Sequence, residues 1–417
     1  MIHTVSPGET LTSIANMYGV SVQKIIYDNQ LNREGRLVVG QALLILIPER
    51  IHIVSPGETV NSISGYYGLP PKQLLQYNPF LLNQAYLLPG ETLAIGYTGE
   101  SLRPERVIGY AYPFILPDIL RETLLYIDEL LVFSYGFTME GELIPPQGEF
   151  ELISQAMEFG VEPILVLTPF AETGSFNNQL VHVASQDLQV QNQLIYNLLY
   201  TVQTKNYRGV DVDFEYILPE DREGYADFVG NLRRVMNANG FKVSVALAPK
   251  VSDDQPGLLY EGMDYGALGA NADTVFLMTY EWGYTYGPPM AVAPVNKVRQ
   301  VLDYAVTKIS VDKILMGIPN YAYDWPLPFV RGETKARTIG NVQAVEIALE
   351  NGAVIQFDDV ALSPYFVYTK EGVSHEVWFE DVRSIQIKLR LAREYGFLGV
   401  GYWNLMRPFR ANWLLLL

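Results

Sequence analysis

Three carboxylates alternate with apolar residues in the segment 209–216, which reads Gly-Val-Asp-Val-Asp-Phe-Glu-Tyr. Alternate side chains of an extended strand share a face, so Asp211, Asp213 and Glu215 are expected in one row, about 6 to 7 Å apart. Neighbouring carboxylates raise each other's pKa, and a carboxyl group of raised pKa can donate a proton near neutral pH. The row therefore predicts acid–base chemistry, with Glu215 as the proton donor and Asp213 helping to hold its proton. Asp211 is expected to share a proton or a hydrogen bond with Asp213.

Short apolar segments separated by longer amphipathic stretches follow residue 107 and predict parallel strands joined by crossover helices. Eight such units in the region 104–417 fit a (β/α)₈ TIM barrel, an α/β fold of about 250 residues before insertions. The expected strands are 107–112, 130–135, 163–168, 209–215, 242–247, 274–279, 313–318 and 399–403. Functional groups of such barrels lie at the carboxyl ends of the strands, so we expect Glu215 at the mouth and Asp211 deeper.

The connection between the last two expected strands is too long for a loop and one helix. We predict a crossover helix at 384–395 and a small α+β insertion at 325–381, which would form one wall of the cleft.

The amino-terminal region contains a repeat. The pattern His-x-Val-x-Pro-Gly-Glu-Thr starts at His3 and again at His52. Each copy predicts a small module of two strands and two helices (βααβ), at 1–48 and 50–97. In the first copy Thr10 is expected to cap a helix that Gly19 ends, and the closing strand is expected at 37–47.

Both copies resemble the LysM domain, through Gly-Glu-Thr, Tyr-Gly and a downstream Asn. The resemblance implies binding of N-acetylglucosamine polymers, peptidoglycan or chitin, between the first strand–helix loop and the second helix–strand loop. The residues that this assigns are Gly8, Glu9, Thr10, Leu11, Asp28, Asn29 and Gln30, with Gly57, Glu58, Thr59, Val60, Tyr77, Asn78 and Pro79. The alternative is that these residues serve only turn and cap geometry.

The acidic segment itself resembles the Asp-x-x-Asp-x-Asp-x-Glu motif of the chitinase-like glycoside hydrolases of family 18. Arg208 stands at the first position of the motif, which is a departure from it. The segment Met278-Thr279-Tyr280 is similar to the family's Met-x-Tyr-Asp, with Glu281 in place of the Asp. Trp403 ends the last expected strand, where the family has the floor of its sugar site.

This resemblance implies retaining, substrate-assisted hydrolysis, in which the 2-acetamido group of the substrate is the nucleophile. Glu215 would protonate the glycosidic oxygen, Asp213 would orient the acetamide, and Tyr280 would donate a hydrogen bond to it. Substrate binding is assigned to Trp403, Tyr112, Met278, Glu281 and Trp282. For Tyr321 and Trp325 two roles remain open: they could line the cleft, or they could pack in the core.

Composition excludes several classes of partner. The formal charge of −17 and the pI near 4.7 disfavour nucleic acid and anionic membranes. The chain has no cysteine, its four histidines are scattered, and we expect no metal and no cofactor. The first residues lack the pattern of a signal peptide.

Together, the paired modules and the barrel resemble the spore cortex fragment-lytic N-acetylglucosaminidases of endospore-forming bacteria. The resemblance implies a peptidoglycan substrate, a role in germination, and a spore-associated location in the coat or cortex. Two alternatives remain for the function: a hydrolase of chitin oligomers, and a non-catalytic protein that binds wall glycan. For the acidic row itself, the alternatives are a calcium site or a solvated strand edge.

Overall fold

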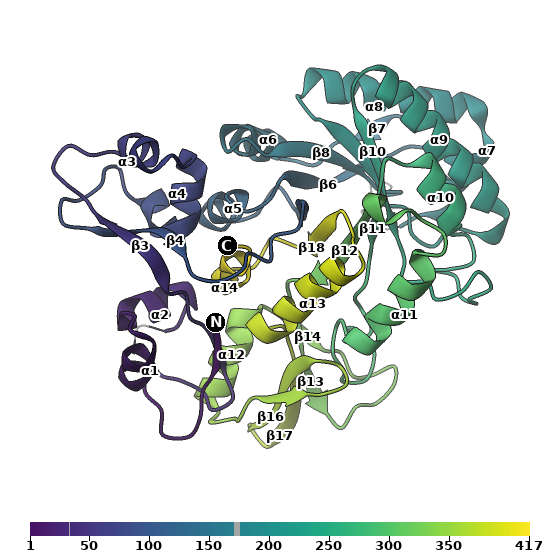
Figure 1. The fold of residues 1–417 in the computed structure, drawn as a ribbon. Helices are drawn as coiled ribbons and strands as arrows, with labels where there is room; N and C mark the ends of the chain where they lie inside the picture. Colours follow the sequence, from purple (N-terminus) through teal and green to yellow (C-terminus); the bar gives the residue numbers. More distant parts are fainter. Residues whose placement is uncertain (33, 171–175) are drawn as a thin grey trace.

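The computed structural model describes residues 1–32, 34–170 and 176–417, and its largest part is a closed barrel (Figure 1). Eight strands pair in parallel, and β5 pairs with both β6 and β18, which closes the ring. The predicted (β/α)₈ fold is therefore confirmed. The barrel strands are β5 (Arg106–Ala111), β6 (Glu129–Phe137), β8 (Glu162–Leu167), β9 (Gly209–Val212), β10 (Lys242–Leu247), β11 (Thr274–Leu277), β12 (Ile314–Pro319) and β18 (Gly399–Trp403), with the short β7 (Leu143–Ile144) antiparallel to β6.

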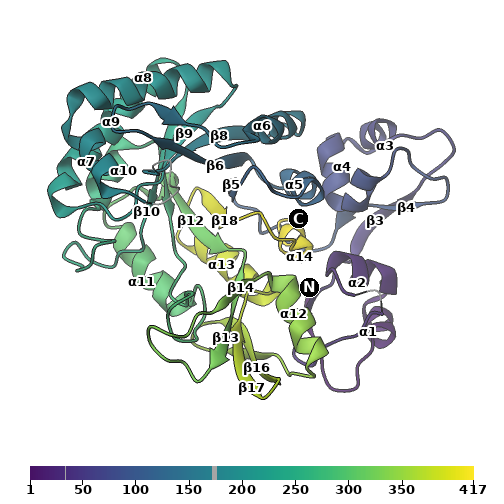
Figure 2. The ribbon, with the colours of Figure 1, turned by 180° about the vertical axis from the view of Figure 1, so that it is seen from behind.

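Helices surround the barrel, as Figures 1 and 2 show. Their apolar faces are turned toward the core. In α9, for example, Tyr225, Phe228, Val229, Leu232 and Met236 are buried, and their spacing of three or four residues forms one apolar face. The helices are α5 (Pro117–Leu124), α6 (Glu149–Glu158), α7 (Asn178–Gln186), α8 (Leu188–Thr204), α9 (Arg222–Ala238), α10 (Tyr265–Asn271), α11 (Val295–Ala305), α13 (Val382–Glu394) and α14 (Arg410–Leu414), with 3₁₀ turns η2 (Pro219–Asp221) and η3 (Val311–Lys313).

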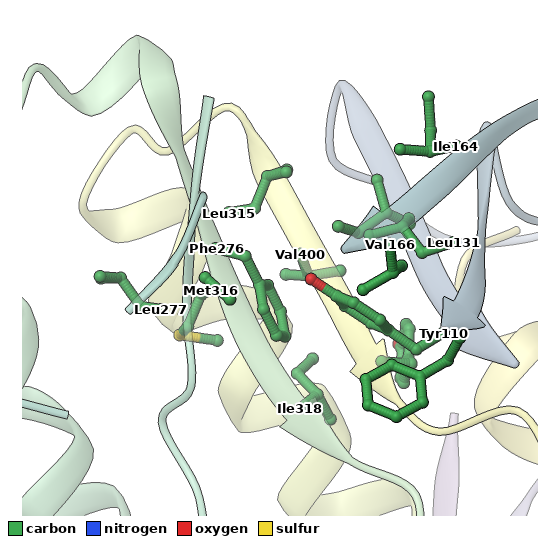
Figure 3. Close-up of a cluster of buried hydrophobic side chains, with 14 of the residues drawn as sticks. Tyr110, Leu131, Ile164, Val166, Phe276, Leu277, Leu315, Met316, Ile318 and Val400 are labelled. Carbon is green, nitrogen blue, oxygen red and sulfur yellow. The ribbon is translucent and has the colours of Figure 1, made fainter. Parts of the chain in front are cut away.

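Side chains fill the interior of the barrel (Figure 3). Tyr110 of β5 and Phe276 of β11 meet there with ring centroids 5.1 Å apart. Aliphatic side chains such as Val166 and Val400, both fully buried, complete the packing around them. The interior is therefore a core, as is usual for this fold, and a ligand has access only at the ends of the strands.

The acidic fourth strand is shorter than the predicted 209–215, since β9 ends at Val212. The amide of Asp213 still donates to the carbonyl of Leu167 at 2.9 Å, but Tyr216 has φ of +57° and ends the extended segment. Glu215 therefore lies just beyond the strand, not at its last residue. In the same way β11 ends at Leu277, before the expected Thr279.

An antiparallel sheet is inserted between β12 and β18, with the strand order β14-β13-β17-β16-β15. One helix packs on it, and buried residues such as Ile339, Phe366 and Val377 form its own core. Its elements are β13 (Ala322–Leu327), β14 (Arg337–Ile339), α12 (Asn341–Glu350), β15 (Gln356–Asp358), β16 (Ser363–Lys370) and β17 (Val373–Trp378); the crossover helix that follows is α13.

Two small modules precede the barrel. The first has β1 (Ile2–Thr4), α1 (Leu11–Tyr18), α2 (Val22–Asp28) and β2 (Ala42–Leu44); the second has β3 (Pro48–Ile53), α3 (Val60–Tyr67), α4 (Pro71–Tyr77), η1 (Pro79–Asn83) and β4 (Thr92–Tyr97). Thr10 caps α1 by accepting from the amide of Ser13 at 3.1 Å, and Gly19 ends that helix with φ of +67°. The closing strand is only 42–44, so the predicted 37–47 was too long.

The first module is docked on the barrel and on its insertion. Val38 packs into the core of the insertion, and the amide of Ile355 donates to the carbonyl of Val39 at 3.0 Å. Gly40, at φ of +84°, lies so close that a Cβ there would be 1.8 Å from the carbonyl oxygen of Ile355. Arg410 of α14 donates to the carbonyl of Tyr27 at 2.8 Å.

The second module is docked on barrel helix α5 and the turn after it. Gln76 donates to the carbonyl of Leu125, and Tyr126 donates to the carbonyl of Gln76 at 2.8 Å. Figures 1 and 2 both show α4 beside α5. Among the helices of the described residues, none combines the length and the hydropathy that crossing a membrane requires.

Candidate active site

A cavity of about 270 Å³ opens where the barrel strands end. Three carboxylates reach it, from Asp213, Glu215 and Glu281. The rest of its lining is largely aromatic, from Tyr110, Tyr112, Phe133, Phe170, Phe176, Tyr260, Phe276, Tyr280 and Trp403, together with Met278, Ala246, Ala248, Pro249 and Leu259. A mostly apolar cavity with a few convergent polar groups is typical of a small-molecule site.

Glu215 has the properties of a general acid in this cavity. Burial, followed by the negative charge of Glu281, raises the pKa of Glu215 to about 7. Both effects disfavour the charged carboxylate, so the group retains its proton close to neutral pH. A proton donor with a pKa near the working pH is the most effective one.

Asp213 is buried beside Glu215, with 5% of its surface exposed. Its Oδ1 atom has no hydrogen-bond partner among the described residues. Burial and the charges of Glu215 and Asp211 raise the pKa of Asp213 well above its usual range. A buried polar atom without a partner costs free energy, so a ligand that supplies a hydrogen bond there would be bound favourably.

Asp211 does not bond to Asp213, which corrects the prediction from the sequence. Its carboxylate accepts hydrogen bonds from Tyr110, at 3.0 Å, and from the hydroxyl of Ser244. Burial raises the pKa of Asp211 to about 6, although these two hydrogen bonds oppose the rise. Asp211 is fully buried and is absent from the lining of the cavity.

Glu281 follows the end of β11 with φ of +69°, an uncommon backbone conformation for a residue other than glycine. Part of the residue is exposed, but its carboxylate accepts hydrogen bonds from the hydroxyls of Tyr321 and Tyr323 on the insertion side. Burial raises the pKa of Glu281, and the two tyrosines counteract that rise. The carboxylate is therefore held in place at the rim of the cavity.

Aromatic rings form one wall of the cavity. The ring of Trp403 lies 4.9 Å from that of Phe133, 5.6 Å from that of Tyr110 and 6.2 Å from that of Tyr112, measured between centroids. Tyr280, with 6% of its surface exposed, also lines the cavity. Such rings can pack against the apolar face of a sugar while hydroxyl groups at their edges form hydrogen bonds.

Most of the predicted barrel residues meet at this cavity. Asp213, Glu215, Tyr280, Trp403, Tyr112, Met278 and Glu281 line it, whereas Trp282 lies outside the lining and packs against the core. Trp325 is fully buried and donates to the carbonyl of Gly287, so it is a packing residue.

Several lining residues were not predicted. Phe133 lies in the middle of the apolar strand β6, so its position in the sequence did not distinguish it from a core residue. Phe170, Phe176 and Tyr260 belong to loops, which carry no periodic pattern.

The predicted glycan-binding residues of the modules have structural partners. The Glu9 carboxylate accepts from the amide of Ser6 at 2.7 Å and from His3 Nε2 at 2.9 Å, and Glu58 has the equivalent two partners. The Asn29 side chain bonds to the backbone of Leu44 through both of its polar atoms, and Asn78 does so with Ala94.

Among the remaining predicted residues, Asp28 is buried and paired with Lys24 at 2.8 Å, and Leu11 is in the core of its module. Thr10 and Thr59 are helix caps. Gly8 and Gly57 sit at turns with φ of +83° and +84°. Tyr77 lines a cavity between the two modules.

Comparisons with known proteins agree with this architecture. The model for glycosyl hydrolases family 18 matches residues 173–407, and the LysM domain model matches residues 3–46 and 52–96. The chain is 38% identical over 431 residues to the cortical fragment-lytic enzyme of Bacillus anthracis, covering 100% of this chain and 97% of that protein. It is 37% identical over 420 residues to the cortical fragment-lytic enzyme of Bacillus subtilis strain 168, with 100% and 97% covered.

Comparison with solved structures also finds similarity over the whole chain. The crystal structure of the Bacillus cereus spore cortex-lytic enzyme SleL superposes with a TM-score of 0.84 at 36% identity, covering 100% of this chain and 96% of that one. The similarity therefore extends over both modules and the barrel.

Proposed function

The chain belongs to the glycosyl hydrolases of family 18, and we propose that it cleaves spore cortex peptidoglycan after N-acetylglucosamine, by retaining, substrate-assisted acid–base catalysis. The observation that carries this proposal is the position of Glu215, which lies in the cavity with its pKa raised to about 7. Beside it is the buried Asp213, with an oxygen that lacks a partner among the described residues.

In the first step Glu215 gives its proton to the glycosidic oxygen, and the leaving sugar departs as an alcohol. The carbonyl oxygen of the substrate's own 2-acetamido group bonds to the anomeric carbon on the opposite face, which forms a cyclic oxazolinium ion. This route is an exception to the scheme with two enzyme carboxylates, because the nucleophile belongs to the substrate.

Asp213 assists that step through the acetamide. Its Oδ1 atom can accept a hydrogen bond from the acetamide N–H, which satisfies a buried oxygen and directs the carbonyl toward the anomeric carbon. Tyr280 lines the same cavity and can donate to the acetamide oxygen. As positive charge develops on the ring, a negative charge on Asp213 would stabilise it.

In the second step Glu215 acts as a base. Having lost its proton, its carboxylate removes a proton from water, and the water oxygen bonds to the anomeric carbon as the oxazolinium ring opens. Two displacements on opposite faces retain the configuration. The carboxylate of Glu281 is a poor nucleophile by comparison, since Tyr321 and Tyr323 donate hydrogen bonds to it.

The substrate and the location are inferred from the relatives and the modules. Relatives that match the whole chain are described as cortical fragment-lytic enzymes, and LysM domains accompany the barrel. We therefore propose that the modules at 1–48 and 50–97 attach the protein to peptidoglycan in the spore coat or cortex. The catalytic domain would be 104–417, with the insertion at 325–381 as one wall of its cleft.

Mass analysis of the products tests the proposal. Purified cortex fragments should yield products with N-acetylglucosamine at the new reducing end, initially in the β configuration by NMR, and chitin oligomers should be cleaved more slowly. A matched oligosaccharide with a 2-hydroxyl in place of the acetamide should resist cleavage, because it lacks the nucleophile. Cleavage of that analogue at a similar rate would exclude the substrate-assisted mechanism.

A further inference from the structure

A second cavity, of about 440 Å³, lies between the two amino-terminal modules. Helix α2 of the first module forms one side of it, and β3, β4 and the turn after α4 of the second module form the other. It shares no residue with the cavity that contains Glu215. Its volume falls within the range of about 300 to 1,000 Å³ that is usual for small-molecule sites.

Four residues of this cavity are ones that the LysM resemblance assigns to glycan binding, but here they have different neighbours: Asp28 in the first module, and Tyr77, Asn78 and Pro79 in the second. The other loop of the second module, 57–60, does not take part. The first module supplies the opposite wall instead, with Lys24 and Tyr27. The cavity is therefore composite, and neither module contains it alone.

Four aromatic rings shape the composite cavity. Tyr27 and Phe80 pack edge to face across the two modules with ring centroids 6.1 Å apart, and Tyr77 and Tyr97 pack in the same manner at 5.7 Å. All four side chains are partly buried, so their orientations are fixed while some ring surface remains accessible. Aromatic rings with polar groups at their edges suit the apolar C–H face and peripheral hydroxyls of a pyranose.

The charged groups in the cavity already compensate each other. Lys24 pairs with Asp28 at 2.8 Å and donates to the hydroxyl of Tyr97 at 2.8 Å. A charged ligand would find no free group of opposite charge here, because Lys24 and Asp28 already neutralise each other among the described residues. An anionic ligand would also be repelled by the net charge of −17. A neutral ligand with hydrogen-bonding groups fits this balance best.

We propose that the cavity between the two modules binds a neutral N-acetylated sugar segment of the substrate glycan, so that one composite site, formed by both modules, attaches the protein to the polymer. This inference rests on the proposed function for its ligand class. In this proposal the sugar contacts both modules at once, so binding depends on how the two modules are placed relative to each other. Two independent grooves, one in each module, would not have that dependence.

Two isoleucines of β3 provide a matched test. Ile51 lines the cavity and is 52% exposed; Ile53 is 61% exposed, is two residues further along the same strand, and does not line the cavity. Alternate residues of a strand share a face, so the main difference between the two positions is that Ile51 lines the cavity and Ile53 does not. Ile51→Trp should fill part of the cavity, and Ile53→Trp serves as the control for a new exposed indole.

The assay is binding of the full chain to insoluble cortex glycan, in a Glu215→Gln background that leaves the polymer intact, with tetra-N-acetylchitotetraose as the soluble competitor. Ile51→Trp should weaken binding by about fivefold because the indole occupies space that the sugar needs, and Phe80→Ala should do so by about the same factor because one ring is lost. Ile53→Trp should bind like the parent. Unfolding temperatures establish that all variants are folded.

Binding of Ile51→Trp equal to that of Ile53→Trp would overturn the composite site, as would a parent that does not bind the polymer. The catalytic proposal fails by a separate observation, the absence of hydrolysis of short soluble fragments by the chain with Glu215 in place. The two outcomes are therefore distinguishable.

Discussion

The carboxylates of Glu215 and Glu281 reach the same cavity from neighbouring parts of the barrel mouth, and they are electrostatically linked. Burial is the first cause of the raised pKa of Glu215, about 7, and the charge of Glu281 is the second. Tyr321, just before β13, and Tyr323, within β13, hold the Glu281 carboxylate in that position. The segment that leads from β12 into the insertion is therefore linked to the proton donor through Glu281.

Removal of the Glu281 charge should shift the pH dependence of the reaction. Glu215 must be protonated in the free enzyme, so kcat/KM should fall as the pH rises through about 7. In Glu281→Gln a nearby negative charge is lost, the Glu215 proton dissociates more readily, and the alkaline limb should move to lower pH. Glu220→Gln, which removes an exposed carboxylate, should leave the limb in place. An unchanged or upward shift in Glu281→Gln would contradict the link.

Tyr280→Phe should lower the catalytic rate because the hydroxyl is assigned to the acetamide oxygen. A donor that acts mainly in the transition state contributes about 10² in kcat, so a loss of that order is expected with little change in KM. The buried ring would remain, and the unfolding temperature should change by little. Steady-state kinetics on a soluble N-acetylated oligosaccharide measure this effect, and a change in KM alone would remove Tyr280 from the chemical step.

Arg410 should be important for the attachment of the first module to the barrel. It donates to both carboxylate oxygens of Glu122 at 2.8 Å, and its guanidinium lies 3.8 Å from the centre of the Tyr27 ring. Because the pair is largely buried, Arg410→Ala should reduce the free energy of unfolding by about 3 kcal/mol. Arg299→Ala breaks a pair of similar geometry with Glu394 that is exposed, and should cost less than about 1 kcal/mol. Equal losses in chemical denaturation would contradict the docking role.

Gly40→Ala tests the close contact between the first module and the insertion. The new Cβ would meet the carbonyl oxygen of Ile355, and steric overlap of this kind costs about 1 to 3 kcal/mol. Gly90 is the equivalent residue of the second module, with φ of +87° and no atom within 4 Å of a Cβ, so Gly90→Ala measures the backbone strain alone. The difference between the two losses, obtained by thermal unfolding, isolates the contact. Equal losses would show that the module does not press against the insertion.

The barrel and the row of acids were predictable because both depend on short-range periodicity. Alternation by two placed Asp213 and Glu215 on one side, and both line the cavity. The predicted strand was three residues too long, since β9 ends at Val212, only the amide of Asp213 continues its pairing, and Tyr216 turns the chain with φ of +57°.

Contacts between distant segments were not predictable in the same way. The hydroxyls that hold Glu281 come from residues about forty positions later, and the partners of Asp211 lie on the neighbouring strand β10 and on β5, on the far side of the barrel. No local pattern records such pairings. The docking of the modules is of the same kind, because Gly40 and Ile355 meet only in the folded chain.

The central claim is that Glu215 is the proton donor, and Glu215→Gln tests it most directly. The amide has nearly the same shape but cannot donate an acidic proton, so the rate of hydrolysis of a soluble cortex fragment should fall by at least about 10², while the fragment still binds with the same affinity. Retention of the parent rate by a folded Glu215→Gln protein would contradict the account.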